Sequence, residues 1–217
     1  MKHLGQTPPA PVNSFIVNLK PYAQRKTTLS ILMVDGSWSM DKHGNAPVVA
    51  VNNYLDQLRE DRNTNHLVGV VIFNDDFRVA IPVTPVHQVG RYTGYRACGN
   101  TLLYRSAKRV LEGVADSWDG LTEREQANLS FYFTIISDGE DNRSPRKNYP
   151  EALASYAIRG RRDGWVLACN GLGISGQLLA QAMSFDPALA ETFDANEAGI
   201  ELATRRAGDL ATRRRAL

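Results

Sequence analysis

Apolar runs of strand length alternate with segments of helical period along most of this chain, and this alternation strongly constrains the fold. The sequence predicts strands over 29–34, 66–73, 77–81, 129–136 and 165–169, and a short last strand over 191–193. It predicts helices over 47–58, 101–118, 150–161, 175–183 and 196 to about 214. Strands that alternate with helices are typical of an α/β domain with a mainly parallel sheet.

One pair of predicted strands, 66–73 and 77–81, is joined only by Asn74-Asp75-Asp76. A parallel crossover needs a dozen or more residues, so we expect this pair to form an antiparallel hairpin. A segment at 14–19, after a proline-rich lead-in, has the pattern of a short edge strand.

The charge of the chain is unevenly distributed. Its 217 residues predict one domain with a sizeable core, and the formal net charge is +2. Residues 203–217 carry five arginines and one aspartate, so this stretch is +4 and the rest of the chain is −2. A basic terminal stretch without a basic body is typical of a solvated helix end, and it does not favour nucleic-acid binding.

Cys98 and Cys169 match neither a zinc-site spacing nor a disulfide framework. We expect two separate free thiols and a reducing, cytoplasmic compartment. The N-terminal segment has no apolar core of a signal peptide, and no apolar stretch has the length of a membrane span. We therefore expect no membrane attachment.

The loop after the first buried strand, 35–40, carries the strongest chemical signal. Asp35, Ser37 and Ser39 place one carboxylate and two hydroxyls at alternating positions. Such hard oxygen donors suit Mg²⁺ or Mn²⁺ and not zinc. Taken alone, the same loop is explained equally well as a helix start capped by Ser39 or Asp41.

Two further loops favour the metal site. Ser137-Asp138-Gly139 ends another apolar strand, and Gly99-Asn100-Thr101-Leu102 begins the long helix. With D-x-S-x-S-M at 35–40, these loops resemble the von Willebrand factor A (vWA) domain family and its metal-ion-dependent adhesion site (MIDAS). The resemblance covers about 29–202, and the three motifs in this order and spacing are jointly specific.

The resemblance implies a doubly wound, mainly parallel six-stranded α/β sheet of order 3-2-1-4-5-6, with one antiparallel edge strand and helices on both faces. Strands 1 and 4 then lie side by side where the strand order reverses, and ligands of open α/β sheets bind in that crevice. Asp35 ends strand 1 and Asp138 ends strand 4. We expect an N-terminal extension over 1–27, the vWA domain over 28–202, and a basic helix end or tail over 203–217.

The resemblance also implies a function. Five side chains would hold Mg²⁺ or Mn²⁺, namely Asp35, Ser37, Ser39, Thr101 and Asp138. An Asp or Glu of a protein partner would complete the coordination. Trp38 stands where the family usually has a small residue, and we expect the partner to contact Trp38, Tyr95, Arg96 and Arg143. The expected protein is a non-enzymatic interaction domain of bacterial or phage style.

Two alternatives use the same loops. A metal-dependent hydrolase or phosphotransferase would need a general base near the ion, for which the sequence offers Glu140, Asp141 and His43. By default, Glu140 and Asp141 are solvated loop acids. A structural subunit with a vestigial site is the other alternative. The sequence identifies neither the partner nor the oligomeric state.

A G-x-G-x-x-G pattern at 171–176 follows a predicted strand and precedes a predicted helix, as a dinucleotide site requires. A dinucleotide-binding domain normally carries this loop after its first strand, whereas this pattern lies near the end of the chain. We therefore interpret it as a plain turn between a strand and a helix.

Overall fold

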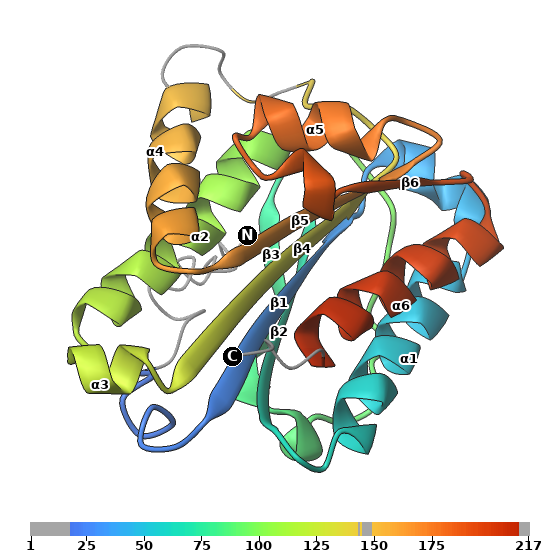
Figure 1. Ribbon diagram of the computed structural model, residues 1–217. Helices are drawn as coiled ribbons and strands as arrows, with labels where there is room; N and C mark the ends of the chain where they lie inside the picture. Colours follow the sequence, from blue (N-terminus) through green and yellow to red (C-terminus); the bar gives the residue numbers. More distant parts are fainter. Residues whose placement is uncertain (1–17, 143, 145–148, 213–217) are drawn as a thin grey trace, which may run out of the picture.

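A single six-stranded sheet organises the molecule (Figure 1), and the computed structural model describes residues 18–142, 144 and 149–212. Its strand order is β3-β2-β1-β4-β5-β6. The strands are β1 (Thr27–Asp35), β2 (Asn65–Phe73), β3 (Phe77–Pro85), β4 (Leu129–Ser137), β5 (Val166–Leu172) and β6 (Glu191–Phe193). Neighbouring strands are parallel except β2 and β3. The strand order and the antiparallel edge strand expected from the sequence are confirmed.

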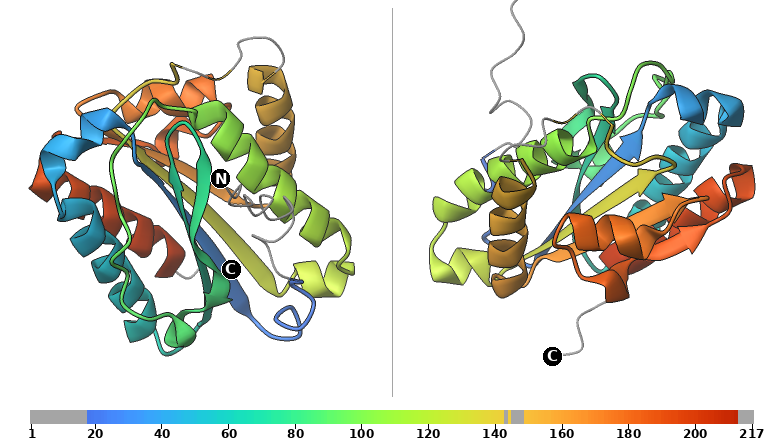
Figure 2. Two further views of the ribbon diagram at one scale, coloured as in Figure 1. Left: turned by 180° about the vertical axis from the view of Figure 1, so that it is seen from behind. Right: turned by 90° about the horizontal axis from the view of Figure 1, so that it is seen from above.

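Helices cover both faces of the sheet (Figure 2). One face is covered by α1 (Ala46–Glu60) and α6 (Glu197–Thr212), and the other by α2 (Leu103–Asp119), α4 (Tyr149–Arg162) and α5 (Gly176–Ala182). Shorter helical turns are η2 (Trp38–His43), η3 (Val86–Gln88), α3 (Glu123–Gln126) and η4 (Pro187–Leu189). The helices expected from periodicity are therefore present on a doubly wound sheet.

The complete burial of the central strand β1 explains why its position was predictable from the sequence. All nine residues of β1 are buried. Leu29, Ile31 and Met33 pack on the side of α2, whereas Leu32 and Val34 pack on the side of α1 and α6. A strand buried on both faces needs a near-continuous apolar run, and the sequence provides one here.

Packing continues beyond both ends of the expected range 28–202. Leu19 and Ala23 lie in the core ahead of β1, and α6 runs through residue 202 with Leu210 buried near its end. Asn18 and Leu19 are not in a strand, and 14–17, the rest of the expected edge strand, lies outside the described residues. The three terminal arginines, 213–215, also lie outside the described part of the chain.

The carboxyl ends of β1 and β4 lie side by side at one edge of the sheet. Val34 of β1 is in register with Ile136 of β4, so Asp35 and Ser137 leave the sheet next to each other. The loops after these strands and the loop before α2 meet at this edge, which is where the predicted site residues lie.

Candidate metal centre

The two acidic residues of the predicted site lie at neighbouring strand ends. Asp35 is the last residue of β1 and is fully buried. Asp138 directly follows β4, and only 1% of its side chain is exposed. Both carboxylates are therefore held by the sheet in a setting that excludes most water.

A chain of hydrogen bonds connects the serines of the first loop to Asp138. The Ser37 and Ser39 hydroxyl oxygens lie 3.0 Å apart, and Ser39 Oγ donates to Asp138 Oδ1 at 2.5 Å. The Ser37 backbone N–H donates to Asp35 Oδ1 at 2.8 Å. Ser39 therefore faces the second acidic loop and does not cap a helix; Asn45 is the N-cap of α1.

Thr101 joins this cluster from the third loop, where it is buried. A Cβ placed on Gly139 would lie 3.6 Å from Thr101 Oγ1, so the hydroxyl lies beside the loop that carries Asp138. Backbone hydrogen bonds tie the first and third loops together, from Trp38 N to Gly99 O at 3.0 Å and from Cys98 N to Gly36 O at 2.7 Å. All five predicted ligands thus come from three loops that touch one another.

The donor set fits a hard divalent cation. It consists of two carboxylates and three hydroxyls, all oxygen, which is the chemistry that Mg²⁺ and Mn²⁺ prefer. Asp138 Oδ2 is buried and accepts no hydrogen bond from the described residues; Lys42 Nζ lies 3.2 Å away, at ion-pair distance but without hydrogen-bonding geometry. Among the described residues there is no group of three or more His, Cys, Asp or Glu side chains that could hold a metal.

Ser137, which the sequence analysis included in the Ser-Asp-Gly motif without assigning it a role, contacts the site residues. Its Oγ lies 2.5 Å from Asp35 Oδ2 and accepts a hydrogen bond from Gly139 N at 3.2 Å. Burial raises the pKa of Asp35 to about 6, and the hydrogen bonds from Ser137 and Ser37 act in the opposite direction. A bound cation would favour the ionised form of this carboxyl further.

The residues predicted to contact a partner differ in exposure. Trp38 is 66% exposed and Arg96 is exposed, so both are accessible beside the site. Tyr95 is half-buried, and its hydroxyl donates to the backbone oxygen of Asp35 at 2.7 Å, so its polar end supports the loop. Arg143 lies outside the described residues.

The structure also describes the three residues that a hydrolase or phosphotransferase could use as a general base. Asp141 was expected to be solvated, but its Oδ2 accepts the backbone N–H of Tyr104 at 2.7 Å and so caps the start of α2. His43 is buried, and burial lowers its pKa. Glu140 is exposed.

The G-x-G-x-x-G segment is a tight turn, as expected. A Cβ on Gly176 would overlap the carbonyl oxygen of Glu191, and a Cβ on Gly171 would overlap that of Ile174. Ser175 caps α5 by accepting the Leu178 N–H. These glycines allow close packing between strand, turn and helix, which accounts for the pattern.

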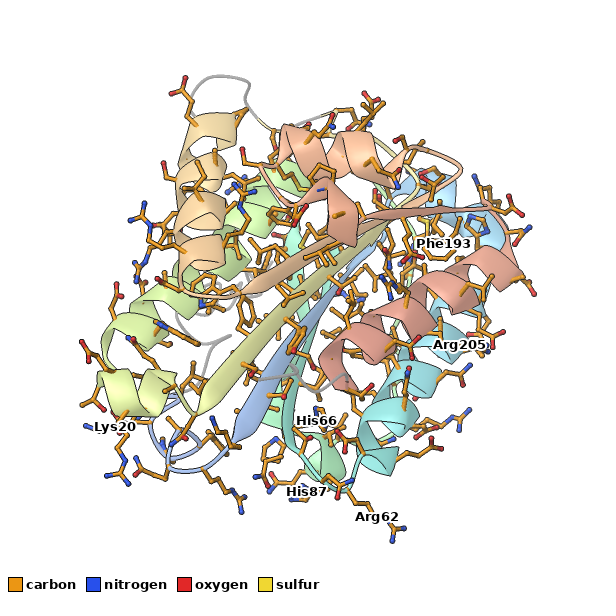
Figure 3. The ribbon with its side chains drawn as sticks, viewed as in Figure 1. Lys20, Arg62, His66, His87, Phe193 and Arg205 are labelled. Carbon is orange, nitrogen blue, oxygen red and sulfur yellow. The ribbon has the colours of Figure 1, made fainter. Side chains whose placement is uncertain are left out.

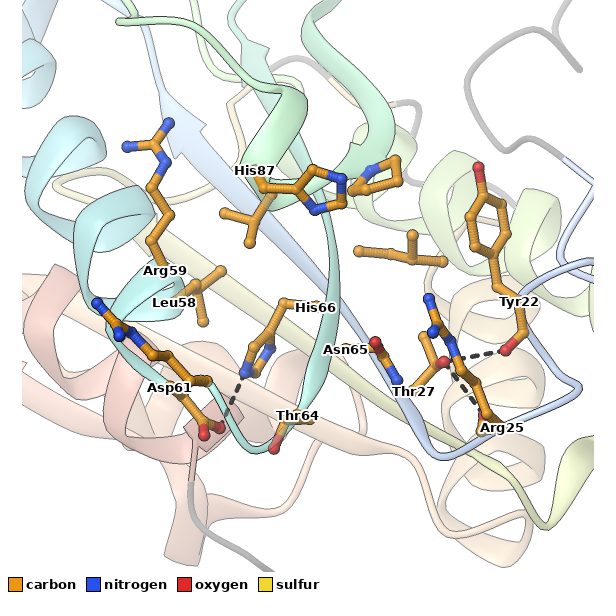
Figure 4. A pocket seen from close by; sticks show the side chains of 14 residues that line it. Tyr22, Arg25, Thr27, Leu58, Arg59, Asp61, Thr64, Asn65, His66 and His87 are labelled. Carbon is orange, nitrogen blue, oxygen red and sulfur yellow. Dashed lines mark hydrogen bonds and ion pairs between the residues drawn. The ribbon is translucent and has the colours of Figure 1, made fainter.

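A cavity of about 210 Å³ lies at the opposite edge of the sheet, where β1 and β2 begin (Figure 4). His66 and His87 line it, and Figure 3 shows them far from Phe193, which ends β6. The His66 side chain is fully buried and its Nε2 lies 3.0 Å from Asp61 Oδ2. This cavity is therefore separate from the candidate metal centre, which lies where β1 and β4 end.

No family model matches the sequence, and no curated protein matches it. Solved structures do match in fold. Proximal thread matrix protein 1 from the mussel byssus has a TM-score of 0.61 at 14% identity, over 87% of this chain and 49% of that one. A vWA protein from Catenulispora acidiphila has a TM-score of 0.59 at 17% identity, over 86% and 43%.

The pilus adhesin SpaC from Lactobacillus rhamnosus GG has a TM-score of 0.63 at 13% identity, over 86% of this chain and 30% of that one. This chain spans half or less of the length of these three proteins. Another structure of the byssus protein has a zinc-occupied MIDAS motif. The chain described here therefore has a vWA-like α/β fold.

Within the described residues, no helix is both long enough and apolar enough to cross a membrane.

Proposed function

We propose that this chain is a metal-dependent protein-interaction domain, with Mg²⁺ or Mn²⁺ held by the five residues predicted from the sequence. The observation that carries the proposal is the state of Asp138, whose side chain is buried. Among the described residues, its Oδ2 accepts no hydrogen bond and has only the exposed ammonium group of Lys42 as counter-charge. A buried carboxylate oxygen without a hydrogen bond is unfavourable, and coordination of a cation would satisfy it. The hydroxyls of Ser39 and Thr101 lie beside the same loop.

The chain's own residues would prepare this site in three ways. Ser137 and the Ser37 N–H hold the Asp35 carboxylate by hydrogen bonds to both of its oxygens. Ser39 is oriented by Asp138, and Tyr95 fixes the backbone of Asp35. When bound, the ion supplies positive charge and one exchangeable position, which a partner's Asp or Glu would occupy.

The surroundings of the site support an acidic partner. Trp38 offers exposed apolar area beside the metal loops, and Arg96 adds an exposed positive charge. We assign Tyr95 and Arg143 to the same contact surface, Tyr95 through the exposed part of its ring. The free Cys98 and Cys169 suit the cytoplasmic location that we propose for this domain.

Calorimetric titration with Mg²⁺ tests the metal site. Asp35→Ala, Thr101→Ala and Asp138→Ala are each expected to weaken Mg²⁺ binding at least about tenfold, because each removes one ligand. Asp116→Ala, on the exposed surface of α2, is the matched control and should bind Mg²⁺ like the parent. If the three site variants also bind like the parent, the assignment of the site is wrong.

The same titration repeated with a short Asp-containing peptide tests the partner chemistry. The peptide is expected to bind in Mg²⁺ and to lose its binding in EDTA, and Trp38→Ala should weaken it. Rising ionic strength should weaken it as well, because exposed charges are screened. Peptide binding that EDTA leaves unchanged would contradict a metal-dependent interaction and favour a purely structural role.

A further inference from the structure

Lys42 lies against Asp138 Oδ2, the one carboxylate oxygen of Asp35 and Asp138 that accepts no hydrogen bond from the described residues. Its Nζ lies 3.2 Å from Asp138 Oδ2, and this is the only ion pair of Asp138 among the described residues. The side chain of Lys42 is 55% exposed, whereas that of Asp138 is 1% exposed. A solvent-exposed ammonium group therefore reaches from the surface to a buried anion.

Local geometry explains how Lys42 reaches this position. Ser39 and Lys42 lie three residues apart within η2, and residues i and i+3 share one side of a 3₁₀ helix. Ser39 Oγ donates to Asp138 Oδ1, and Lys42 Nζ faces Asp138 Oδ2. One helical turn thus contacts both oxygens of Asp138. Ser39, a proposed metal ligand, donates to Oδ1, and the ammonium group of Lys42 faces Oδ2.

We propose that Lys42 is a built-in competitor of the metal ion at Asp138. This inference rests on the proposed function, since it concerns the same site. The ammonium group and the divalent ion are alternative counter-cations for Asp138 Oδ2. Loading of the metal displaces Lys42 to the solvent, and the residue lowers the affinity for the metal while stabilising the metal-free protein.

Competition has a consequence for partner binding. The loop that carries Lys42 also carries Trp38, which is exposed beside the site. Metal loading therefore releases a positive charge on the surface to which an acidic partner would bind. The partner then meets both the ion and the freed ammonium group, so its attraction to the site is linked to metal occupancy.

An ordinary solvated lysine would behave differently. It would repel a nearby cation through long-range electrostatics, and its removal would raise the metal affinity slightly without changing the metal-free protein. The competitor model requires two effects together, tighter metal binding and a less stable metal-free protein, because Asp138 loses its counter-ion. Stability in EDTA separates the two models.

The test uses the full chain and Lys42→Met. Calorimetric titration is expected to show Mg²⁺ binding about three- to tenfold tighter than in the parent. The thermal midpoint of Lys42→Met should be lower than that of the parent in EDTA and equal to it in saturating Mg²⁺. Lys42→Arg keeps a cation at this position and should restore the midpoint in EDTA.

Arg91→Met is the matched control, because Arg91 is another exposed cation and belongs to neither the proposed metal site nor the proposed partner surface. It should leave the midpoint in EDTA unchanged. An unchanged affinity, or an unchanged midpoint of Lys42→Met in EDTA, would overturn the competitor model while the proposed function stands. A parent that binds no Mg²⁺ would overturn the proposed function and the competitor model together.

Discussion

Replacement of Ser137 by alanine tests whether the buried carboxylate of Asp35 is held in place by its neighbour. Ser137 is fully buried, and its hydroxyl lies 2.5 Å from Asp35 Oδ2. The substitution removes one oxygen atom and leaves the backbone of β4 unchanged. It removes the hydrogen bond to a buried carboxylate, together with the contacts of the hydroxyl with Gly139 O at 2.9 Å and Gly139 N at 3.2 Å.

The expected magnitude follows from the charge of that acceptor. A hydrogen bond to a charged group contributes about 1.5–3 kcal/mol to stability. In a domain of this size, 1 kcal/mol corresponds to roughly 2–4 °C in thermal midpoint. Ser137→Ala should therefore lower the midpoint at pH 7 in EDTA by roughly 3–12 °C. Because a residue that orients a ligand typically affects metal affinity 10- to 100-fold, Mg²⁺ binding should weaken by about that factor.

Differential scanning calorimetry in EDTA and Mg²⁺ titration measure the two effects. Ser30→Ala is the matched control, since Ser30 is a buried serine in the middle of β1 whose Oγ donates a 3.4 Å hydrogen bond to Leu67 O and also interacts with the Tyr54 hydroxyl, away from the candidate site. The control should leave the Mg²⁺ affinity unchanged. Our reasoning is refuted if Ser137→Ala keeps both the midpoint and the affinity of the parent.

The pH dependence of stability in EDTA gives an independent check on Asp35. Its pKa is raised from 3.8 to about 6 by burial, so the folded protein binds more protons than the unfolded chain between these values. The contribution of Asp35 is therefore fully present below about pH 4, falls as the pH rises to about 6, and is lost above it. A shift of about 2 units corresponds to about 3 kcal/mol.

Urea unfolding at pH 4 to 7 measures this effect as the difference in stability between the parent and Asp35→Asn. The difference should change by about 3 kcal/mol across the window, with the parent losing stability relative to the variant as the pH rises. Ser137→Ala removes a hydrogen bond that lowers the pKa of Asp35, so it should shift the transition to higher pH. A difference that stays constant with pH would contradict a buried, proton-binding Asp35.

Two further predictions concern the rest of the fold. One thiol should react with a disulfide reagent in the native protein and two in urea, because Cys169 is fully buried, with its pKa raised to about 12, whereas Cys98 is partly exposed. Gly176→Ala should lower the thermal midpoint strongly, because its Cβ would overlap the carbonyl oxygen of Glu191. A Cβ at Gly90 would meet open space, so Gly90→Ala should leave the midpoint unchanged.

The positions of the strands and the hairpin were predictable because the chain carries strong local signals, whereas the order of the strands was implied by the resemblance to vWA domains. A buried central strand is a continuous apolar run, and the three-residue turn after Phe73 permits only an antiparallel return. The segment at 14–19 had a weaker signal, since a short apolar run does not distinguish a strand from a buried turn. Its end at Leu19 forms a turn anchored in the core, with Tyr22 N and Ala23 N donating to Leu19 O.

The sequence named residues that the structure brings together at one end of the sheet, but it did not indicate the side chains that support them. Sequence spacing identified Asp35 and Asp138, since each follows a buried strand. The Ser-Asp-Gly motif gave a sequence signal for the role of Ser137. A serine at the end of an apolar strand is nevertheless normally assigned to packing. No sequence signal indicated the role of Asp141, since its partner, the N–H of Tyr104, lies 37 residues earlier in the chain.

The three loops that carry the proposed ligands are linked by hydrogen bonds, and part of this linkage follows from how α2 begins. The N-cap residue of α2, Leu102, has no side chain that can accept a hydrogen bond. Instead, Asp141 Oδ2 accepts from Tyr104 N at 2.7 Å, and Asn142 Oδ1 accepts from Thr101 N at 3.0 Å. An acidic side chain at a helix N-terminus is favourable, so these contacts stabilise the helix as well as the loop. Thr101 and the loop after Asp138 are therefore positioned together, and any displacement of one displaces the other.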